Sequence, residues 1–261
     1  MERIYKYPRT PHISGSGLQA GDEDLNTVSF HELAGKRLVV EEKMDGANSG
    51  ISFDEKGQLY LQSRGHFLMG GAREAQFHLL KSWAHRYAGE LWALLGKRYV
   101  MYGEWLYAKH TVFYTDLPHY FLEFDIYDKE QDQFLSTERR RDMLTAAPFI
   151  VSVKVLIEGS FRSLRQLQAW IGDSHFIAAD HVQQLRAAAA AQGMDPERVV
   201  RETDMSRKME GLYIKLEENG VVKGRYKYVR NGFLQTILDS NSHWMERPLL
   251  PNRLQKGVSL F

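Results

Sequence analysis

Short runs in which apolar and polar residues alternate recur along this chain and predict antiparallel strands. Residues 49–53 and 59–62 form two such runs on either side of a polar segment with a glycine, a pattern typical of a hairpin. Residues 209–215 and 221–230 repeat the arrangement around an Asn-Gly pair, the dipeptide that two-residue turns favour. The pattern therefore predicts two hairpins far apart in the sequence.

Three more apolar runs, at residues 99–107, 120–128 and 151–157, predict further strands. The first carries one glutamate, Glu104, in its middle. Because a carboxylate is costly to desolvate, a charge inside such a run indicates pairing or ligand binding. In the second run, strict alternation predicts two faces, with Phe121, Glu123 and Asp125 on one and Leu122, Phe124 and Ile126 on the other.

Helical spacing of apolar residues marks other regions. Residues 73–95 carry apolar side chains three and four positions apart and predict an amphipathic helix, interrupted near Gly89. Residues 137–141 begin a short helix whose three consecutive arginines are expected on the solvated surface. Residues from about 160 to 205 predict a helical insert, with a proline-containing helix start after Asp195.

The two ends of the chain do not follow these periods. Residues 5–17 are rich in turn formers, and residues from about 240 to 261 contain two prolines and predict an extended strap. With 43% hydrophobic residues in 261, the chain can bury the core of one domain over residues 1–261. Strands and helices in this order predict an α+β fold.

Composition excludes several classes of protein. The chain has 34 basic and 33 acidic residues, a net charge of +1, so nucleic acid would have to bind a local basic face. The absence of cysteine excludes disulfides and thiolate metal sites. No apolar run is long enough to span a bilayer or to form a signal peptide. We expect a cytoplasmic protein with no membrane partner.

The candidate chemistry centres on Lys43, which follows the apolar run 38–40 and precedes Asp45 and Gly46. In enzymes that attach a nucleotide to themselves, a lysine amine attacks the α-phosphate of a nucleoside triphosphate and pyrophosphate leaves. Free lysine titrates near pH ~10.4, so such a site needs burial or nearby cations to favour the neutral amine. A solvated turn is the alternative interpretation of the Lys-x-Asp-Gly motif at residues 43–46.

Other charged residues supply partners for this chemistry. Arg64 ends the second strand of the first hairpin and returns toward Lys43, although a solvated arginine is the simpler interpretation. Lys223, Arg225 and Lys227 alternate along the last strand and predict one cationic face. Lysines that protect an edge strand from aggregation would give the same pattern.

Taken in this order, the motifs from residue 41 to residue 230 resemble those of the covalent nucleotidyltransferases, which include ATP-dependent DNA and RNA ligases and mRNA capping enzymes. The chain is most similar to ATP-dependent RNA ligases of the phage RNA ligase 2 type and their bacterial relatives. The resemblance implies a nucleotidyltransferase domain in which two antiparallel sheets form a cleft, resembling that of ATP-grasp proteins, with helices outside.

The resemblance assigns roles by position in the first half of the chain. Lys43 matches the lysine that accepts AMP, and Glu42 matches the position that contacts adenine. Asn48 matches an asparagine that binds near the phosphate. Arg64 matches a ribose or phosphate contact, and Glu104 matches the glutamate that binds ribose hydroxyls.

Further roles follow from the second half. Phe124 matches the ring that stacks on adenine, in agreement with the physics of base stacking. Glu210 matches the carboxylate that helps to hold the catalytic metal. The family's Lys-x-Lys pair corresponds here to Arg225 and Lys227, a departure from the pattern that leaves Lys223 open as a substitute for Arg225.

The implied reaction needs ATP and Mg²⁺ or Mn²⁺. Lys43 takes AMP from ATP, AMP moves to the 5′-phosphate of an RNA, and a 3′-hydroxyl displaces it to seal the break. Magnesium suits this role because it is a hard, oxygen-loving ion. An end-healing kinase or phosphatase is an expected partner, because many RNA breaks lack a 5′-phosphate and a 3′-hydroxyl.

Three alternatives stay open. A DNA ligase shares the first step but usually carries an OB-fold after the last motif, and about thirty residues follow Arg230, too few for that fold. A capping enzyme would select guanine. A non-catalytic nucleic-acid-binding module would lack Lys43 or Glu210, and both are present. The natural RNA and the oligomeric state also stay open.

Overall fold

A computed structural model describes residues 3–18, 27–239 and 248–261 of the chain. Its strands are β1 (Arg37–Lys43), β2 (Ala47–Phe53), β3 (Leu59–Ser63), β4 (Tyr99–Trp105), β5 (Phe121–Asp128), β6 (Gln133–Leu135), β7 (Val151–Ser152), β8 (Val155–Ser160), β9 (Gly211–Glu218) and β10 (Val221–Val229). Its helices are η1 (Phe30–Glu32), η2 (Ala72–Phe77), α1 (His78–Arg86), α2 (Ala88–Leu95), α3 (Thr137–Leu144), α4 (Leu164–Gln168), α5 (His181–Ala191), α6 (Pro196–Arg201) and α7 (Asn231–Asp239).

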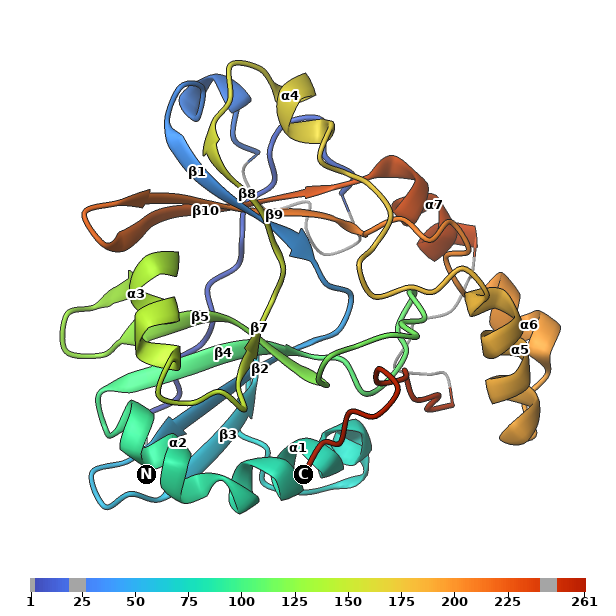
Figure 1. The fold of residues 1–261 in the computed structure, drawn as a ribbon, viewed down its shortest axis with the longest axis horizontal. Coiled ribbons are helices and arrows are strands. Elements are labelled where there is room, and N and C mark those ends of the chain that lie inside the picture. Colours follow the sequence, from blue (N-terminus) through green and yellow to red (C-terminus); the bar gives the residue numbers. More distant parts are fainter. Residues whose placement is uncertain (1–2, 19–26, 240–247) are drawn as a thin grey trace.

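The described strands form one hydrogen-bonded sheet in the order β3-β2-β4-β5-β6-β10-β9-β1-β8, with β7 paired to β5. All neighbours are antiparallel except β5 and β7. Figure 1 shows β1, β8, β9 and β10 in the upper half of the molecule and β2 to β5 in the lower half. The mixed fold is as predicted, but the two expected sheets are continuous because the short strand β6 pairs with both β5 and β10.

Both predicted hairpins are present. Strands β2 and β3 pair from Ser49 opposite Ser63 to Phe53 opposite Leu59. The turn between β9 and β10 holds Asn219 at φ 53° and Gly220 at φ 75°, the left-handed conformation that this turn requires. The Asn-Gly pair is therefore what allows the two strands to turn back directly.

The predicted faces of β5 hold for Leu122 and Phe124 and are wrong beyond Phe124. Its register with β4 shifts, so that Tyr102 lies opposite Asp125 and Gly103 lies opposite Glu123, which leaves Phe124 as an extra residue. Such a bulge reverses the alternation that follows it. Asp125 consequently lies on the same side of the sheet as Phe124.

Helices cover the lower half of the sheet. The helical region predicted for residues 73–95 consists of η2, α1 and α2, and the break falls at Tyr87, two residues before Gly89. Trp83 of α1 stacks on Phe121 of β5 with ring centroids 5.5 Å apart. The strand predicted at residues 151–157 is two strands, β7 and β8.

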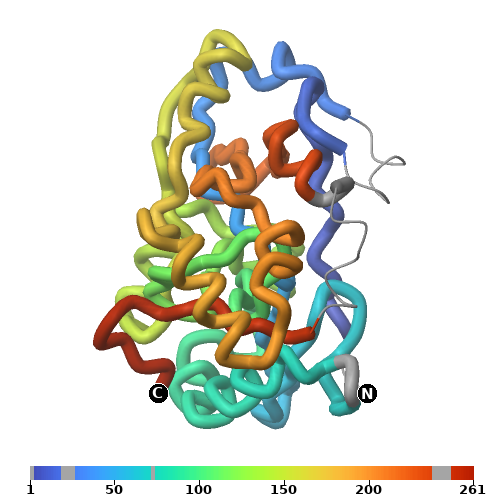
Figure 2. The backbone as a smooth tube through the Cα atoms, turned by 90° about the vertical axis from the view of Figure 1, so that its right-hand side faces the viewer, coloured from blue at the N-terminus to red at the C-terminus, as the bar shows by residue number. Residues whose placement is uncertain are grey.

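Helices α4, α5 and α6 occupy the region predicted as a helical insert. The side chain of Asp195 accepts a hydrogen bond from the Glu197 backbone N–H and caps α6, as the proline-containing start predicted. Figure 2 shows residues 248–261, in red, running beside α5 and α6. Asn252 fixes this segment by accepting from the Tyr114 N–H and donating to the Leu106 carbonyl. The first part of the predicted strap, residues 240–247, lies outside the described residues.

Candidate active site around Lys43

The candidate site begins with an ion pair between Lys43 and Glu210. Lys43 is the last residue of β1 and lies opposite Gly211, the first residue of β9. Glu210 immediately precedes Gly211 in the chain and therefore lies next to Lys43. The Nζ atom of Lys43 lies 2.7 Å from both carboxylate oxygens of Glu210. The Lys43 side chain retains 22% of its surface exposed, whereas that of Glu210 retains 3%. Lys43 is thus partly accessible, whereas the carboxylate of Glu210 is buried.

Asp45 is rigidly oriented beside this pair. One of its carboxylate oxygens accepts hydrogen bonds from the backbone N–H groups of Thr111 and Val112, both at 2.7 Å. Its own N–H donates to the hydroxyl of Tyr114 at 2.8 Å. Because Asn252 holds the backbone of Tyr114, the C-terminal segment supports the turn that follows Lys43.

The charges around Lys43 favour its protonated form. Burial alone would lower the pKa of Lys43, but the carboxylates of Glu210 and Glu104 outweigh burial and raise it. Burial in turn raises the pKa of Glu104 and that of Glu210 to about 7. The sequence-based expectation that nearby cations favour the neutral amine is not met, because the nearest charged groups are carboxylates. The positive charge of Lys227 does act on Glu210 and lowers its pKa in part.

Three other predicted residues lie near this pair. Asn48 of β2 is paired with Glu104 of β4 across the sheet. The side-chain oxygen of Asn48 is buried, and no hydrogen-bond donor among the described residues reaches it. Arg64 is exposed just after β3, and its charge acts on the Glu104 carboxyl. The structure therefore brings Lys43, Asn48, Arg64 and Glu104 close to one another.

Glu42 occupies a different environment. It is fully buried, with its side chain bonded to the segment before α5. The Ser174 hydroxyl donates to one oxygen at 2.5 Å, and the ring and backbone of His175 contact the other at 2.9 and 3.3 Å. The resemblance assigned the Glu42 carboxylate to adenine, but in the structure it is bonded to Ser174 and His175. The sequence analysis did not predict this contact.

Phe124 lies in a cluster of rings that includes the N-terminal segment. Its ring centroid is 5.2 Å from that of Tyr7, in an edge-on contact, and 6.2 Å from that of Tyr213. The hydroxyl of Tyr7 bonds to both Asp125 and Tyr213. Sequence reasoning missed Tyr7, since nothing in the turn-rich residues 5–17 indicated which of them enters the core.

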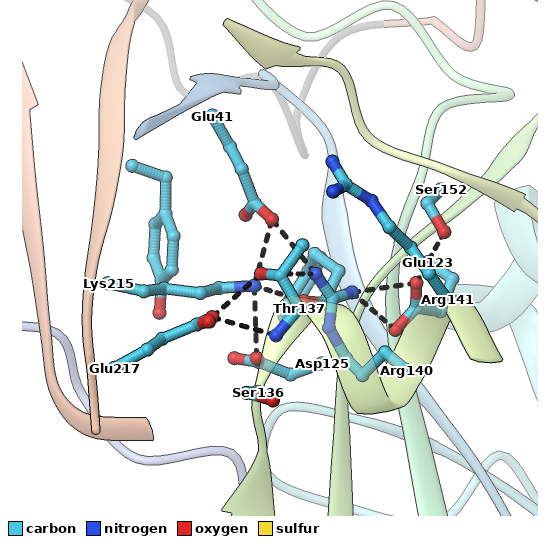
Figure 3. Close-up of polar contacts among 12 residues, drawn as sticks. Glu41, Glu123, Asp125, Ser136, Thr137, Arg140, Arg141, Ser152, Lys215 and Glu217 are labelled. Atoms are coloured by element: carbon cyan, nitrogen blue, oxygen red, sulfur yellow. Dashed lines mark hydrogen bonds and ion pairs between the residues drawn. The ribbon is translucent and has the colours of Figure 1, made fainter. Parts of the chain in front are cut away.

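A buried network of charges, shown in Figure 3, contacts the backbone of Phe124 through Lys215. Lys215 bonds to Glu41 at 3.0 Å, forms an ion pair with Asp125 at 3.1 Å and donates to the Phe124 carbonyl. Arg140 of α3 bonds Glu123 at 2.7 Å and Glu41 at 3.0 Å. The network therefore links β1, β5, β9 and α3.

Both cations of this network were absent from the sequence-based site. Arg140 is 2% exposed, which corrects the expectation that the three consecutive arginines are all solvated. Lys215 is a charged residue within an apolar run. The same signal indicated Glu104, so it could also have indicated Lys215. A helix turns each successive residue by about 100°, so one arginine of three can face inward.

The three cations of β10 do not share one face. The register with β9 shifts between Val222 and Gly224, so Lys223 is a bulge residue and not a member of the predicted ladder. Arg225 lies over the ring of Phe134, 3.7 Å from its centroid. The charge of Lys227 acts on Glu210 and lowers its pKa in part.

A divalent cation fits this site only if phosphate oxygens of a bound nucleotide supply part of its coordination. The described residues contain no group of three or more His, Cys, Asp or Glu side chains placed to hold a metal ion. Mg²⁺ in nucleotide sites commonly uses one or two carboxylates together with substrate phosphates. Glu210 next to an accessible amine supplies that single carboxylate.

Comparisons with known proteins identify related chains. A model of the RNA ligase family matches residues 36–229, a segment that contains all the strands from β1 to β10. No curated protein gives a significant match. No helix among the described residues is both long enough and apolar enough to cross a membrane.

Three solved structures of variants of the RNA ligase from Naegleria gruberi share the fold. A ligand-free variant has a TM-score of 0.54 and 18% identity, and covers 90% of this chain and 64% of its own. A variant with AMP and Mn has a TM-score of 0.53, 17% identity and coverages of 91% and 65%. A variant with ATP and Mn has a TM-score of 0.51, 17% identity and coverages of 89% and 58%. This chain thus spans less than two thirds of each.

Proposed function

Because this chain belongs to the RNA ligase family, we propose that it is an ATP-dependent RNA ligase whose Lys43 carries AMP between ATP and RNA. The observation that carries the proposal is the accessible amine of Lys43 within 2.7 Å of Glu210, inside the matched segment. The Naegleria gruberi enzyme, solved with ATP, AMP and Mn, supports the choice of ligand and metal.

The first chemical step forms a bond between Lys43 Nζ and the α-phosphorus of ATP, and the bond from that phosphorus to the pyrophosphate oxygen breaks. AMP then passes to the 5′-phosphate oxygen of an RNA end, which restores the lysine. Attack by a 3′-hydroxyl on that 5′-phosphate forms the phosphodiester and releases AMP.

The attacking amine must first lose its proton. The carboxylates of Glu210 and Glu104 raise the pKa of Lys43, so the ammonium form dominates. Binding of a divalent cation at Glu210 would neutralise the nearest carboxylate and stabilise phosphate charge. Asp45, fixed by two backbone N–H groups, keeps the Lys43 turn in place during the step.

Nucleotide contacts are part of the same proposal. Asn48, with its unpaired buried oxygen, and Arg64 and Glu104 around it would bind ribose and phosphate. Phe124 would stack on the base. Lys227 would bind the α-phosphate, because its charge reaches Glu210.

Incubation of the protein with Mg²⁺ and labelled ATP or GTP, followed by denaturation, tests this function. ATP should leave label on the protein. Lys43→Ala should abolish the label and leave the fold intact, because a partly exposed amine contributes little packing. Lys43→Arg should fail as well, since a guanidinium stays protonated. Label retained on either variant, or label from GTP in preference to ATP, would contradict the proposal.

We also propose that the whole chain forms one adenylyltransferase domain, with a helical insert at about 160–205. The single sheet that runs from β1 to β10 supports this. An end-healing kinase or phosphatase is the proposed partner, because sealing requires 5′-phosphate and 3′-hydroxyl ends. A cytoplasmic location fits the absence of cysteine from the sequence.

A further inference from the structure

A cavity of about 710 Å³ lies between the N-terminal segment, the end of β5, β6 and the start of β10. Its volume is in the range of cavities that hold small ligands. Neither Lys43 nor Glu104 nor Glu210 lines it. Arg225, one of the predicted nucleotide contacts, does line it, so the cavity lies beside the site around Lys43 and does not include the reacting amine.

The sheet register places this cavity away from the reacting amine. Lys43 lies opposite Gly211, and Gly211 lies opposite Val229 of β10. Arg225, which lines the cavity, precedes Val229 by four residues, a separation of about 13 Å along a strand. The contact of Arg225 with Phe134 of β6 directs its guanidinium toward the end of the sheet remote from Lys43.

Hydrogen-bonded side chains around Tyr7 lie between the cavity and Phe124. The hydroxyl of Tyr7 bonds to Asp125 and Tyr213, and its ring packs edge-on against Phe124. The guanidinium of Arg225 lies on another side of the same Tyr7 ring, 5.3 Å from its centroid. A base stacked on Phe124 would not reach the cavity without displacing Tyr7.

The cavity is strongly cationic in a chain whose net charge is only +1. Four cationic side chains line it, Arg3, Lys6, Lys223 and Arg225, against one carboxylate, Asp132. That carboxylate already accepts a hydrogen bond from the Tyr127 hydroxyl. The lining therefore favours an anion.

One cation in the lining has unused hydrogen-bonding capacity. The Nη1 atom of Arg225 is buried, and no acceptor among the described residues reaches it. A buried guanidinium N–H without an acceptor is costly, so a ligand oxygen at this position would be strongly favoured. Phosphate oxygens match the geometry of a guanidinium well.

Flat rings accompany these cations. Tyr5 and Tyr127 are partly exposed, with ring centroids 5.8 Å apart, and Tyr102 and Phe134 complete the lining. Aromatic rings interleaved with cations are what single-stranded nucleic acid binds, bases on the rings and phosphates on the cations. The combination distinguishes this cavity from a site for a simple inorganic anion.

We propose that this cavity is a second nucleotide-binding site, which holds one nucleotide unit of a single-stranded RNA away from the reacting end. Its phosphate bonds Arg225 and Lys223, and its base packs on Tyr127. The proposal rests on the proposed function for its choice of RNA. A free mononucleotide has the same chemistry, and the test below distinguishes the two sources.

The test uses a labelled six-nucleotide RNA with a 5′-hydroxyl, which cannot accept AMP, and measures its binding to the full chain over a salt series. The double variant Lys6→Gln, Lys223→Gln removes two exposed charges from the lining. We expect its affinity to fall about tenfold at low salt. The slope of log affinity against log salt should fall by up to about 0.7 in magnitude, the value for the one phosphate that Lys223 contacts.

Arg201→Gln is the matched control, because Arg201 is an exposed cation at the end of α6 and outside the lining. It should leave the affinity and the slope near those of the wild type. Tyr127→Ala should weaken binding with no change in the salt slope, since it removes a ring of the lining and no charge. Equal effects of the double variant and of Arg201→Gln, or no effect of either, would overturn the proposal.

Two further measurements separate the possible sources and the two proposals. Displacement of the RNA by uridine 5′-monophosphate would show that one free nucleotide suffices, and its failure to compete would show that the site needs a strand. Self-adenylation of the single variant Lys6→Gln, which changes no predicted nucleotide contact, should stay within about twofold of the wild type. Loss of RNA binding in the double variant, combined with a wild type that never takes label from ATP, would retain the cavity site and refute the ligase function.

Discussion

At the scale of single residues, Phe124 combines two roles, the proposed stacking on the base and packing in the protein core. It is the proposed base-stacking ring, and it is 8% exposed in a cluster with Tyr7 and Phe134. Phe124→Ala would therefore disturb both packing and binding. A substitution that keeps apolar volume but removes the flat ring separates the two effects.

We predict that Phe124→Leu weakens the use of ATP by about 1 to 3 kcal/mol, the scale of a lost base-aromatic stack. The melting temperature should fall only slightly, because Leu retains most of the apolar contact. Phe134→Leu, at the same exposure and in the same cluster, is the control and should leave the ATP dependence of self-adenylation unchanged. An equal loss in both variants would show that Phe124 is only a core residue.

A second prediction at this scale concerns the pH dependence of folding stability, which follows from the pKa of the Glu104 carboxyl. Burial raises its pKa from 4.5 to about 7, so the folded protein holds this proton more tightly than the unfolded chain. Between these two values stability must fall as pH rises, because the folded state then carries a buried charge. Removal of the ionisable group should relieve this loss.

Glu104→Gln should accordingly raise the melting temperature relative to the wild type at pH 8, and the gain should shrink toward pH 5. Thermal unfolding in the absence of nucleotide measures it. Glu55→Gln, at a side chain with 84% of its surface exposed, should show no such trend. A gain that grows toward acid pH would contradict the assignment.

At the scale of elements, the site depends on the close approach of β9 and β10. A Cβ atom on Gly211 would lie 1.9 Å from the Tyr228 carbonyl oxygen, so the strands would have to separate. Gly211 is also the residue paired with Lys43, and it follows Glu210 directly. The same glycine therefore sets the strand contact and the Lys43–Glu210 pair.

We predict that Gly211→Ala lowers both the melting temperature and the rate of self-adenylation, the rate by at least tenfold, because the Lys43–Glu210 geometry shifts with the strand. Gly159→Ala is a matched control, since Gly159 lies in β8 of the same sheet and a Cβ there meets no atom within 4 Å. Near-normal adenylation in Gly211→Ala would show that the close approach is unimportant for the site.

At the scale of the whole molecule, the near balance of charge limits RNA binding. Phosphate contacts supply most of the non-specific affinity for nucleic acids, and a net charge of +1 leaves few cations for them. Many of the cations are moreover paired, such as Arg140 and Lys215 in the buried network. Handling of the RNA is thus expected to be weaker than the chemistry at Lys43.

We predict that the purified chain adenylates itself readily but joins RNA slowly, and that joining falls steeply with salt. Single-turnover rates of both steps, measured from about 50 to 200 mM salt, test this. Addition of an end-healing kinase or phosphatase should improve the sealing of damaged ends. Efficient sealing by the chain alone at physiological salt, at the rate of its adenylation, would refute the need for a partner.

Local sequence was sufficient for much of this protein. The hairpins, most helices and the strand positions of Lys43 and Glu104 follow from periodicity and turn residues, which act over a few neighbours. The motif order from Lys43 to Glu210 was enough to indicate the family that the comparison identifies. The grouping of Asn48 and Arg64 with Glu104 also agreed with the sequence.

Only the tertiary structure decided what depends on partners distant in sequence. The bulges at Phe124 and Lys223 arise from the register of neighbouring strands, and they redirect Asp125 and separate Lys223 from Lys227. The insertion of Tyr7 beside Phe124 brings together residues 117 positions apart, which no local period encodes. A sequence pattern fixes which face of an isolated strand is apolar, whereas the partner strands fix where that face points and which charges are buried together.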